Sequence, residues 1–157
     1  MSALHPQLVP PAQGEGASPT RSVGPDAALD DAARRWGDLH GFEGKPGQLL
    51  VVPDAEGGVS QVLVGAGRDF DPMSARGLSA RLPGGLYRLE AEPEPARQAA
   101  LAFLLGTYVF DRYKARTDKA PVRLVAPEGL GLAETSGIAA AARIQRMMLV
   151  VVENRIW

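Results

Sequence analysis

The stretch "VGAGRD", residues 64–69, contains the residue types of a phosphate-binding loop. Its Gly-x-Gly pattern follows an apolar run, and such a turn can present backbone N–H groups to a phosphate at the start of a helix. The third glycine of the dinucleotide fingerprint is missing because position 70 is Phe, and the Walker lysine is missing too. A turn that leaves a strand is the favoured interpretation, and ligand binding at Gly65–Gly67 is the alternative.

Two carboxylates lie close together in "PDAEGG", residues 53–58. The oxygens of Asp54 and Glu56 could in principle bind a divalent cation. No histidine or third carboxylate accompanies them, and paired carboxylates at the tip of a hairpin usually contact water. We therefore predict no metal ligand in this turn.

The sequence contains no complete catalytic constellation. Of its 2 histidines, His5 lies in a proline-rich segment and His40 lies at the end of a predicted helix, where the dipole favours positive charge. Neither has a nucleophile or an acid at a recognisable spacing, and no serine lies in a Gly-x-Ser-x-Gly elbow. Cysteine is absent, which excludes thiolate catalysis, disulfides and Cys-rich zinc sites. The sequence predicts no catalytic, cofactor-binding or metal-binding residue.

The segment "LAFLLGTYVFDRYK", residues 101–114, combines aromatic and charged side chains. Tyr108, Phe110 and Tyr113 could stack on nucleic-acid bases. The net charge is −1, however, so the chain has no basic surplus for a phosphate backbone. Aromatic residues at helical spacing more often lie in a core. We therefore expect a buried helix, with a solvated end at residues 111–114, and no nucleic-acid partner.

The elements that would position these residues follow from hydrophobic periodicity and turn signals. A first helix is predicted from Asp26, its N-cap, to a stop at Gly41. The turn 53–58 joins two strands in a hairpin. The predicted elements, in chain order, are a helix at 26–39, strands at 48–52 and 59–64, a short helix at 71–82, a strand at 84–91, a helix at 95–116, a strand at 120–129 and a helix at 133–147.

This order predicts a single α/β domain with a mixed, partly antiparallel sheet flanked by helices. Residues 1–25 are rich in proline and are predicted to be a flexible leader, in which residues 7–9 could add an edge strand. The domain itself is expected at 26–146, followed by an atypical apolar tail at 147–157. The run "MMLVVV" is too short to span a membrane. No secretory signal is recognisable, so a cytoplasmic protein without a membrane partner is expected.

Several segments resemble the amino-terminal domain of the leucine (cytosol) aminopeptidase family. These are "ALAFLLGTYVFDRYK" at 100–114, "APVRLVAPEG" at 120–129, the hairpin region 41–68, and "LPGGLYRL" at 82–89. The resemblance covers roughly residues 26–142 in consistent order. It implies a macro-domain-like α/β unit without metal ligands. The family's catalysis belongs to a larger carboxy-terminal domain that binds two divalent metals, zinc or manganese, and activates a water.

Two departures limit what the resemblance implies. The "DAEG" at residues 54–57 echoes the family's "NTDAEGR" metal motif but lacks the flanking residues and lies in the wrong domain, so it is interpreted as coincidence. After "SGIAAAARI", the sequence "QRMMLVVVENRIW" departs from the family pattern, as a truncated or out-of-frame end would. The apolar run at 147–152 would need burial in this domain, a partner copy or an aggregate.

Three hypotheses follow for the chain. The leading one is a non-catalytic accessory domain that packs on the parent's catalytic domain or on other copies of itself. The second is a free-standing, macro-like module that binds a nucleotide or ADP-ribose at a strand-end crevice. The third is a self-associating module that uses the valine-rich tail.

Overall fold

The computed structural model describes residues 5–107 and 120–153, with side chains left out at 143 and 146–153. Its centre is a 6-stranded sheet in the order β1-β6-β5-β2-β4-β3. Neighbouring strands are parallel except for the antiparallel pair β3 and β4. The strands are β1 Leu8–Val9, β2 Ser18–Val23, β3 Leu49–Pro53, β4 Val59–Gly65, β5 Gly85–Glu90 and β6 Val122–Val125. The predicted mixed α/β fold and its hairpin are confirmed.

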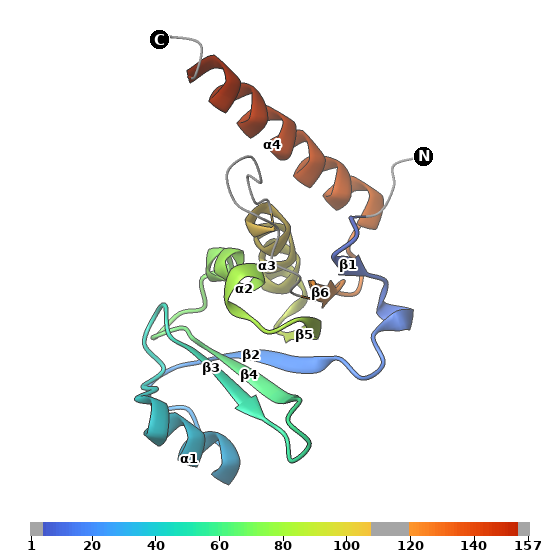
Figure 1. Cartoon of the computed structure of the whole chain (residues 1–157). Coiled ribbons are helices and arrows are strands. Elements are labelled where there is room, and N and C mark those ends of the chain that lie inside the picture. Colours follow the sequence, from blue (N-terminus) through green and yellow to red (C-terminus); the bar gives the residue numbers. More distant parts are fainter. Residues whose placement is uncertain (1–4, 108–119, 154–157) are drawn as a thin grey trace.

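Helices cover both faces of this sheet. They are α1 Asp31–His40, α2 Leu78–Arg81, α3 Pro93–Gly106 and α4 Leu132–Glu153, together with the 3-10 turns η1 Pro11–Gln13 and η2 Pro72–Gly77. Figure 1 shows α1 on one side of the sheet and α2, α3 and α4 on the other. The chain between β4 and β5 therefore passes β2 on the side of α3.

Each face of the sheet has its own apolar core. On the α1 side, Leu50 and Leu63 of the hairpin pack with Ala33 of α1, and Trp36 adds a partly buried ring. The larger core lies under α3, where Phe103 and Tyr87 are almost completely buried. The hydroxyl of Tyr87 donates a hydrogen bond to the carbonyl oxygen of Pro83, 2.8 Å away, and burial raises the pKa of this phenol.

The prediction of a flexible leader over residues 1–25 is wrong for the part that forms strands. β1 pairs with β6 at the edge, as expected for residues 7–9. Residues 18–23, however, form β2, which lies between β4 and β5. Pro19 argues against a central strand because it lacks an N–H group. Pro19 pairs with Arg88 of β5 but has no partner in β4, because the pairing of β2 with β4 begins only at Thr20.

The first helix begins later than the sequence predicted. Its N-cap is Asp30 and not Asp26, and the carboxylate of Asp30 accepts a hydrogen bond from the N–H of Ala33 at 2.8 Å. The helix ends at Gly41, which has the left-handed conformation (φ 65°) that was expected of a stop signal. The side chain of Gln61 donates a second hydrogen bond to Asp30, 2.6 Å long, which ties the start of α1 to β4.

Replacing Asp30 with alanine is expected to lower the free energy of unfolding by about 0.5–2 kcal/mol at pH 7, the usual cost of losing an N-cap. The hydrogen bond from Ala33, and then that from Gln61, lower the pKa of Asp30. Its charged form therefore stabilises the fold above the unfolded pKa, and this contribution disappears as the pH falls through the folded pKa. Urea unfolding at pH 7 and pH 2.5 measures both effects. Asp30→Asn, which keeps the cap, serves as control; equal stability of all three proteins at pH 7 would contradict the assignment.

The last two long helices differ from their predicted bounds. α3 begins at Pro93 and not Pro95, and its described part ends at Gly106. The remainder of the predicted helix, to Arg116, lies outside the described residues. α4 runs from Leu132 to Glu153 and not from 133 to 147, so its backbone continues through most of the predicted apolar tail.

Candidate functional site

The glycine loop 64–69 uses its backbone donors within the protein. The N–H groups of Gly65, Ala66 and Gly67 donate to the carbonyl oxygens of Gln48, Val23 and Gly44, respectively, at 2.8–3.0 Å. A phosphate-binding loop needs such groups free to point at the ligand. The loop is therefore bonded as a strand-exit turn, the favoured interpretation of its sequence.

Tight packing explains the glycines in this loop. A side chain at Gly65 would overlap with the carbonyl oxygen of Lys45, and one at Gly67 would come within 2.9 Å of the Pro46 ring. Gly67 also has a positive φ of 64°. Close packing against residues 44–46, rather than approach to a ligand, accounts for the Gly-x-Gly pattern.

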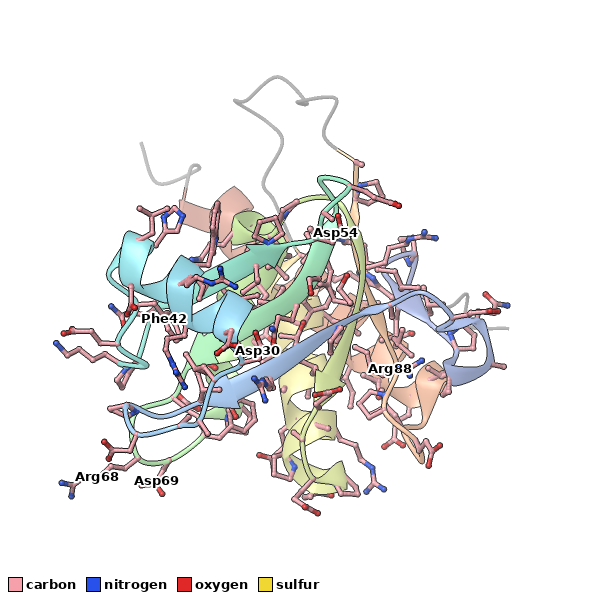
Figure 2. All side chains as sticks on the ribbon, turned by 90° about the horizontal axis from the view of Figure 1, so that it is seen from below. Asp30, Phe42, Asp54, Arg68, Asp69 and Arg88 are labelled. Atoms are coloured by element: carbon pink, nitrogen blue, oxygen red, sulfur yellow. The ribbon has the colours of Figure 1, made fainter. Side chains whose placement is uncertain are left out.

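Asp54 organises the hairpin turn. Its Oδ1 atom accepts hydrogen bonds from the N–H groups of Glu56 and Gly58, at 2.9 and 2.7 Å. This is an Asx-type turn, in which an aspartate side chain bonds the backbone that follows it. Figure 2 places Asp54, Asp30 and Arg88 at separate places on the molecule, so these charged groups do not converge on a site.

Within the described ranges 5–107 and 120–153, no group of His, Asp and Glu side chains is arranged to hold a metal ion. The absence of metal ligands from the whole chain stays a prediction.

His5 was expected in a flexible leader but makes specific contacts. Its backbone N–H donates to Oγ of the buried Ser136 in α4 at 3.1 Å, and its ring Nδ1 accepts from the N–H of Gln7 at 3.3 Å. Its Nε2 lies 3.4 Å from Oγ1 of Thr107, whose hydroxyl donates to the carbonyl oxygen of Leu104. Because Nδ1 accepts a hydrogen bond, the ring proton of His5 is on Nε2. Nε2 therefore cannot accept a hydrogen bond from the hydroxyl of Thr107. The cluster fastens the N-terminal segment to the ends of α3 and α4.

His40 lies at the C-terminal end of α1, as predicted. Its ring stacks at an angle on Trp36, with 4.7 Å between the ring centroids. The two histidines do not lie next to each other. His5 contacts α4, and α4 lies on the opposite side of the sheet from α1, which contains His40.

The aromatic segment 101–114 is described only in its first half. Phe103 and Leu104 are buried in the larger core, and Leu101 and Leu105 are half-buried. This part of the helix is structural, as predicted. Tyr108, Phe110 and Tyr113, with the charged residues 111–114, lie outside the described residues.

No pattern of residues indicated the small cavity that lies at the carboxyl ends of β2 and β5. Thr20 and Ser22 of β2 line it, together with Ser74 of η2. Its apolar wall consists of Val64, Phe70, Ala75, Leu78 and Leu89. The space open to a water-sized molecule is about 10 Å³. Single serines and threonines in a strand are common, so only the three-dimensional packing identifies this place.

A family model described as "M17 aminopeptidase, N-terminal domain" matches residues 26–127. The chain belongs to this family. The match includes the hairpin, β5, α3 and β6, which are the segments that carry the resemblance seen in the sequence. No curated protein matches this chain at a significant level.

Solved structures agree with this family assignment. The cytosol aminopeptidase of Coxiella burnetii is 26% identical with a TM-score of 0.65, and the match covers 77% of this chain but 28% of that one. The bottromycin maturation enzyme BotP is 25% identical with a TM-score of 0.52, covering 82% of this chain and 30% of that one. A mutant of tomato leucine aminopeptidase, at 16% identity and a TM-score of 0.55, shares the fold over 88% of this chain and 36% of its own.

This chain therefore matches only 28–36% of the length of these proteins. None of the helices described at residues 5–107 and 120–153 is both long and apolar enough to cross a membrane.

Proposed function

We propose that this chain is a non-catalytic accessory domain of an M17-type aminopeptidase, which packs on a catalytic domain and helps subunits assemble. The observation that carries the proposal is the coverage: the match takes in 77% of this chain and 28% of the Coxiella burnetii cytosol aminopeptidase. The remaining, larger part of such a protein would supply the two divalent metals, zinc or manganese, and the reaction. A cytoplasmic location follows from this parentage as part of the proposal.

The surface of α4 supports a role in packing. Its Thr135, Ser136 and Ala139 are buried against the domain. Two large apolar side chains of the same helix remain open to solvent, Ile138 at 47% and Ile144 at 55% exposure. Large apolar groups on a helix are stabilised when a partner covers them. We place the contact with the catalytic domain, or with another copy of this chain, on this side of α4.

The packing role can be tested by exchanging these isoleucines. The tagged chain is purified from the cells that naturally express it, and copurifying chains are identified by mass spectrometry. We expect a metal-dependent aminopeptidase subunit with the wild type and at least a tenfold loss of it with I138S/I144S, a loss that corresponds to about 1.4 kcal/mol. Met73→Ser, which changes an equally exposed residue of η2, is the matched control. Equal recovery with all three proteins would refute a contact through α4.

The absence of catalysis is a separate prediction. The purified chain is expected to release no p-nitroaniline from leucine-p-nitroanilide above the buffer rate, with manganese or zinc added, because the described residues contain no cluster of metal ligands. An intact leucine aminopeptidase under the same conditions is the positive control. Metal-dependent turnover that follows the chain through every purification step would overturn the proposal.

A further inference from the structure

The neighbouring strands β2 and β5 send the chain to opposite faces of the sheet. They are parallel, with Thr20 opposite Leu89 and Arg21 opposite Glu90. After β2 the chain continues to α1 on one face, and after β5 it continues to α3 on the other. Where such connections diverge, open α/β sheets leave a crevice at the carboxyl ends of the strands. In this domain the crevice is the cavity lined by Thr20, Ser22 and Ser74.

The chain between β4 and β5 closes most of this crevice. It must cross β2 because β2 lies between β4 and β5 in the sheet. Phe70 and the turn η2 make the crossing, and Ala75 of η2 is buried in the core under α3. The space that remains, about 10 Å³, is that of roughly one water molecule. A nucleotide is far larger than this space.

One polar atom in the cavity needs a partner. Thr20 is only 2% exposed. Its Oγ1 forms no hydrogen bond with any group in residues 5–107 and 120–153. A buried hydroxyl without a partner destabilises the folded state. Ser22 and Ser74 line the same cavity, so β2 and η2 each contribute a hydroxyl-bearing residue to its wall.

We propose that this cavity binds a single ordered water, which hydrogen-bonds to Thr20 and joins β2 to the crossing turn η2. A water has two donors and two acceptor sites and typically takes several protein partners in such a place. The rest of the wall consists of five apolar residues from β4, β5 and the crossing segment, together with Arg21, Glu90 and Ala91. The site is structural: it satisfies a buried polar group where other α/β sheets have room for a ligand.

The proposal is tested by crystallography of the full chain at high resolution and by thermal unfolding. In the wild type we expect density for one water at about 2.7–3.0 Å from Thr20 Oγ1. Thr20→Val keeps the shape but removes the hydroxyl, so it should lose the water and melt at a lower temperature. Thr20→Ser keeps the hydroxyl and should retain the water.

Two results would overturn the proposal. The first is a dry cavity in the wild type, checked independently by the absence of a water-to-amide Overhauser signal at Thr20. The second is a higher melting temperature for Thr20→Val than for the wild type, which would mean that the hydroxyl is buried without a partner and that removing it relieves the cost. Density for a molecule larger than water would likewise contradict it.

Discussion

Replacing Phe103 with alanine is expected to lower the free energy of unfolding by about 3–5 kcal/mol, which is the usual range for Phe→Ala in a core. The Phe103 ring is 1% exposed and packs in the core under α3 with Tyr87 and Leu124. Alanine removes most of these contacts and leaves a cavity that the neighbouring strands can only partly fill. Urea unfolding at pH 7 measures the change as a lower midpoint with an unchanged slope.

The matched control is Ile138→Ala, which shortens a large apolar side chain of a helix at a position with 47% exposure. We expect it to change the free energy of unfolding by no more than about 0.5 kcal/mol. A cost below about 1 kcal/mol for Phe103→Ala would contradict the role of α3 as a scaffold, because a ring that lines an open cleft is already in contact with water.

Periodic apolar patterns predicted most of the fold. The hairpin, β5, β6 and α3 each contain several large apolar residues at strand or helix spacing, and each begins within two residues of its predicted start. The hairpin supplied the antiparallel pair that makes the sheet mixed. These elements could be recognised because their burial is encoded locally, in the spacing of their own side chains.

The strand β2 could not be predicted in this way. Its sequence, "SPTRSV", has one large apolar residue, Val23, and contains Pro19, so it has the local character of a loop. It is nevertheless a central strand because β4 and β5 bond it on both sides, and those partners are 41 or more residues away in sequence, as the bond from Ser18 to Val59 shows. Long-range pairing of this kind overrides weak local propensity.

The candidate sites also divide into features that local sequence predicts and features that depend on long-range contacts. The favoured interpretation of the glycine loop as a strand-exit turn agrees with the structure because it rests on local turn chemistry. The contacts of His5 with α4 and the cavity beside Thr20 depend on segments that meet only in the folded chain. The family resemblance, by contrast, was visible from short segments, since it compares residue patterns and needs no long-range packing.

The chain is an M17 N-terminal domain, and the cavity at the carboxyl ends of β2 and β5 has room for about one water. Phe103 and Leu104 of α3 are buried in the core under the helix, and the backbone of α3 approaches η2 closely at Gly106. At this position, the last residue of α3, the close approach leaves no room for a side chain.

Replacing Gly106 with alanine is expected to destabilise the domain by about 3 kcal/mol, at the upper end of the usual cost of overpacking. Gly106 is the last residue of α3, and a Cβ atom there would overlap with the carbonyl oxygen of Arg76 in η2. The carbonyl oxygen of Gly106 also accepts a hydrogen bond from the hydroxyl of Ser79 at 3.0 Å. A shift of α3 away from η2 would therefore disturb this bond as well. Urea unfolding at pH 7 is the measurement.

Gly137→Ala provides the matched control because Gly137 lies inside α4 and a Cβ atom there meets no other group within 4 Å. Alanine favours the helix over glycine by about 1 kcal/mol, so this variant should be somewhat more stable than the wild type. The same Gly→Ala substitution is thus expected to lower the free energy of unfolding at Gly106 and to raise it at Gly137. Only the contact between α3 and η2 distinguishes the two positions. If Gly106→Ala were as stable as Gly137→Ala, α3 could not lie against the backbone of Arg76, and the closed crossing over β2 would be wrong.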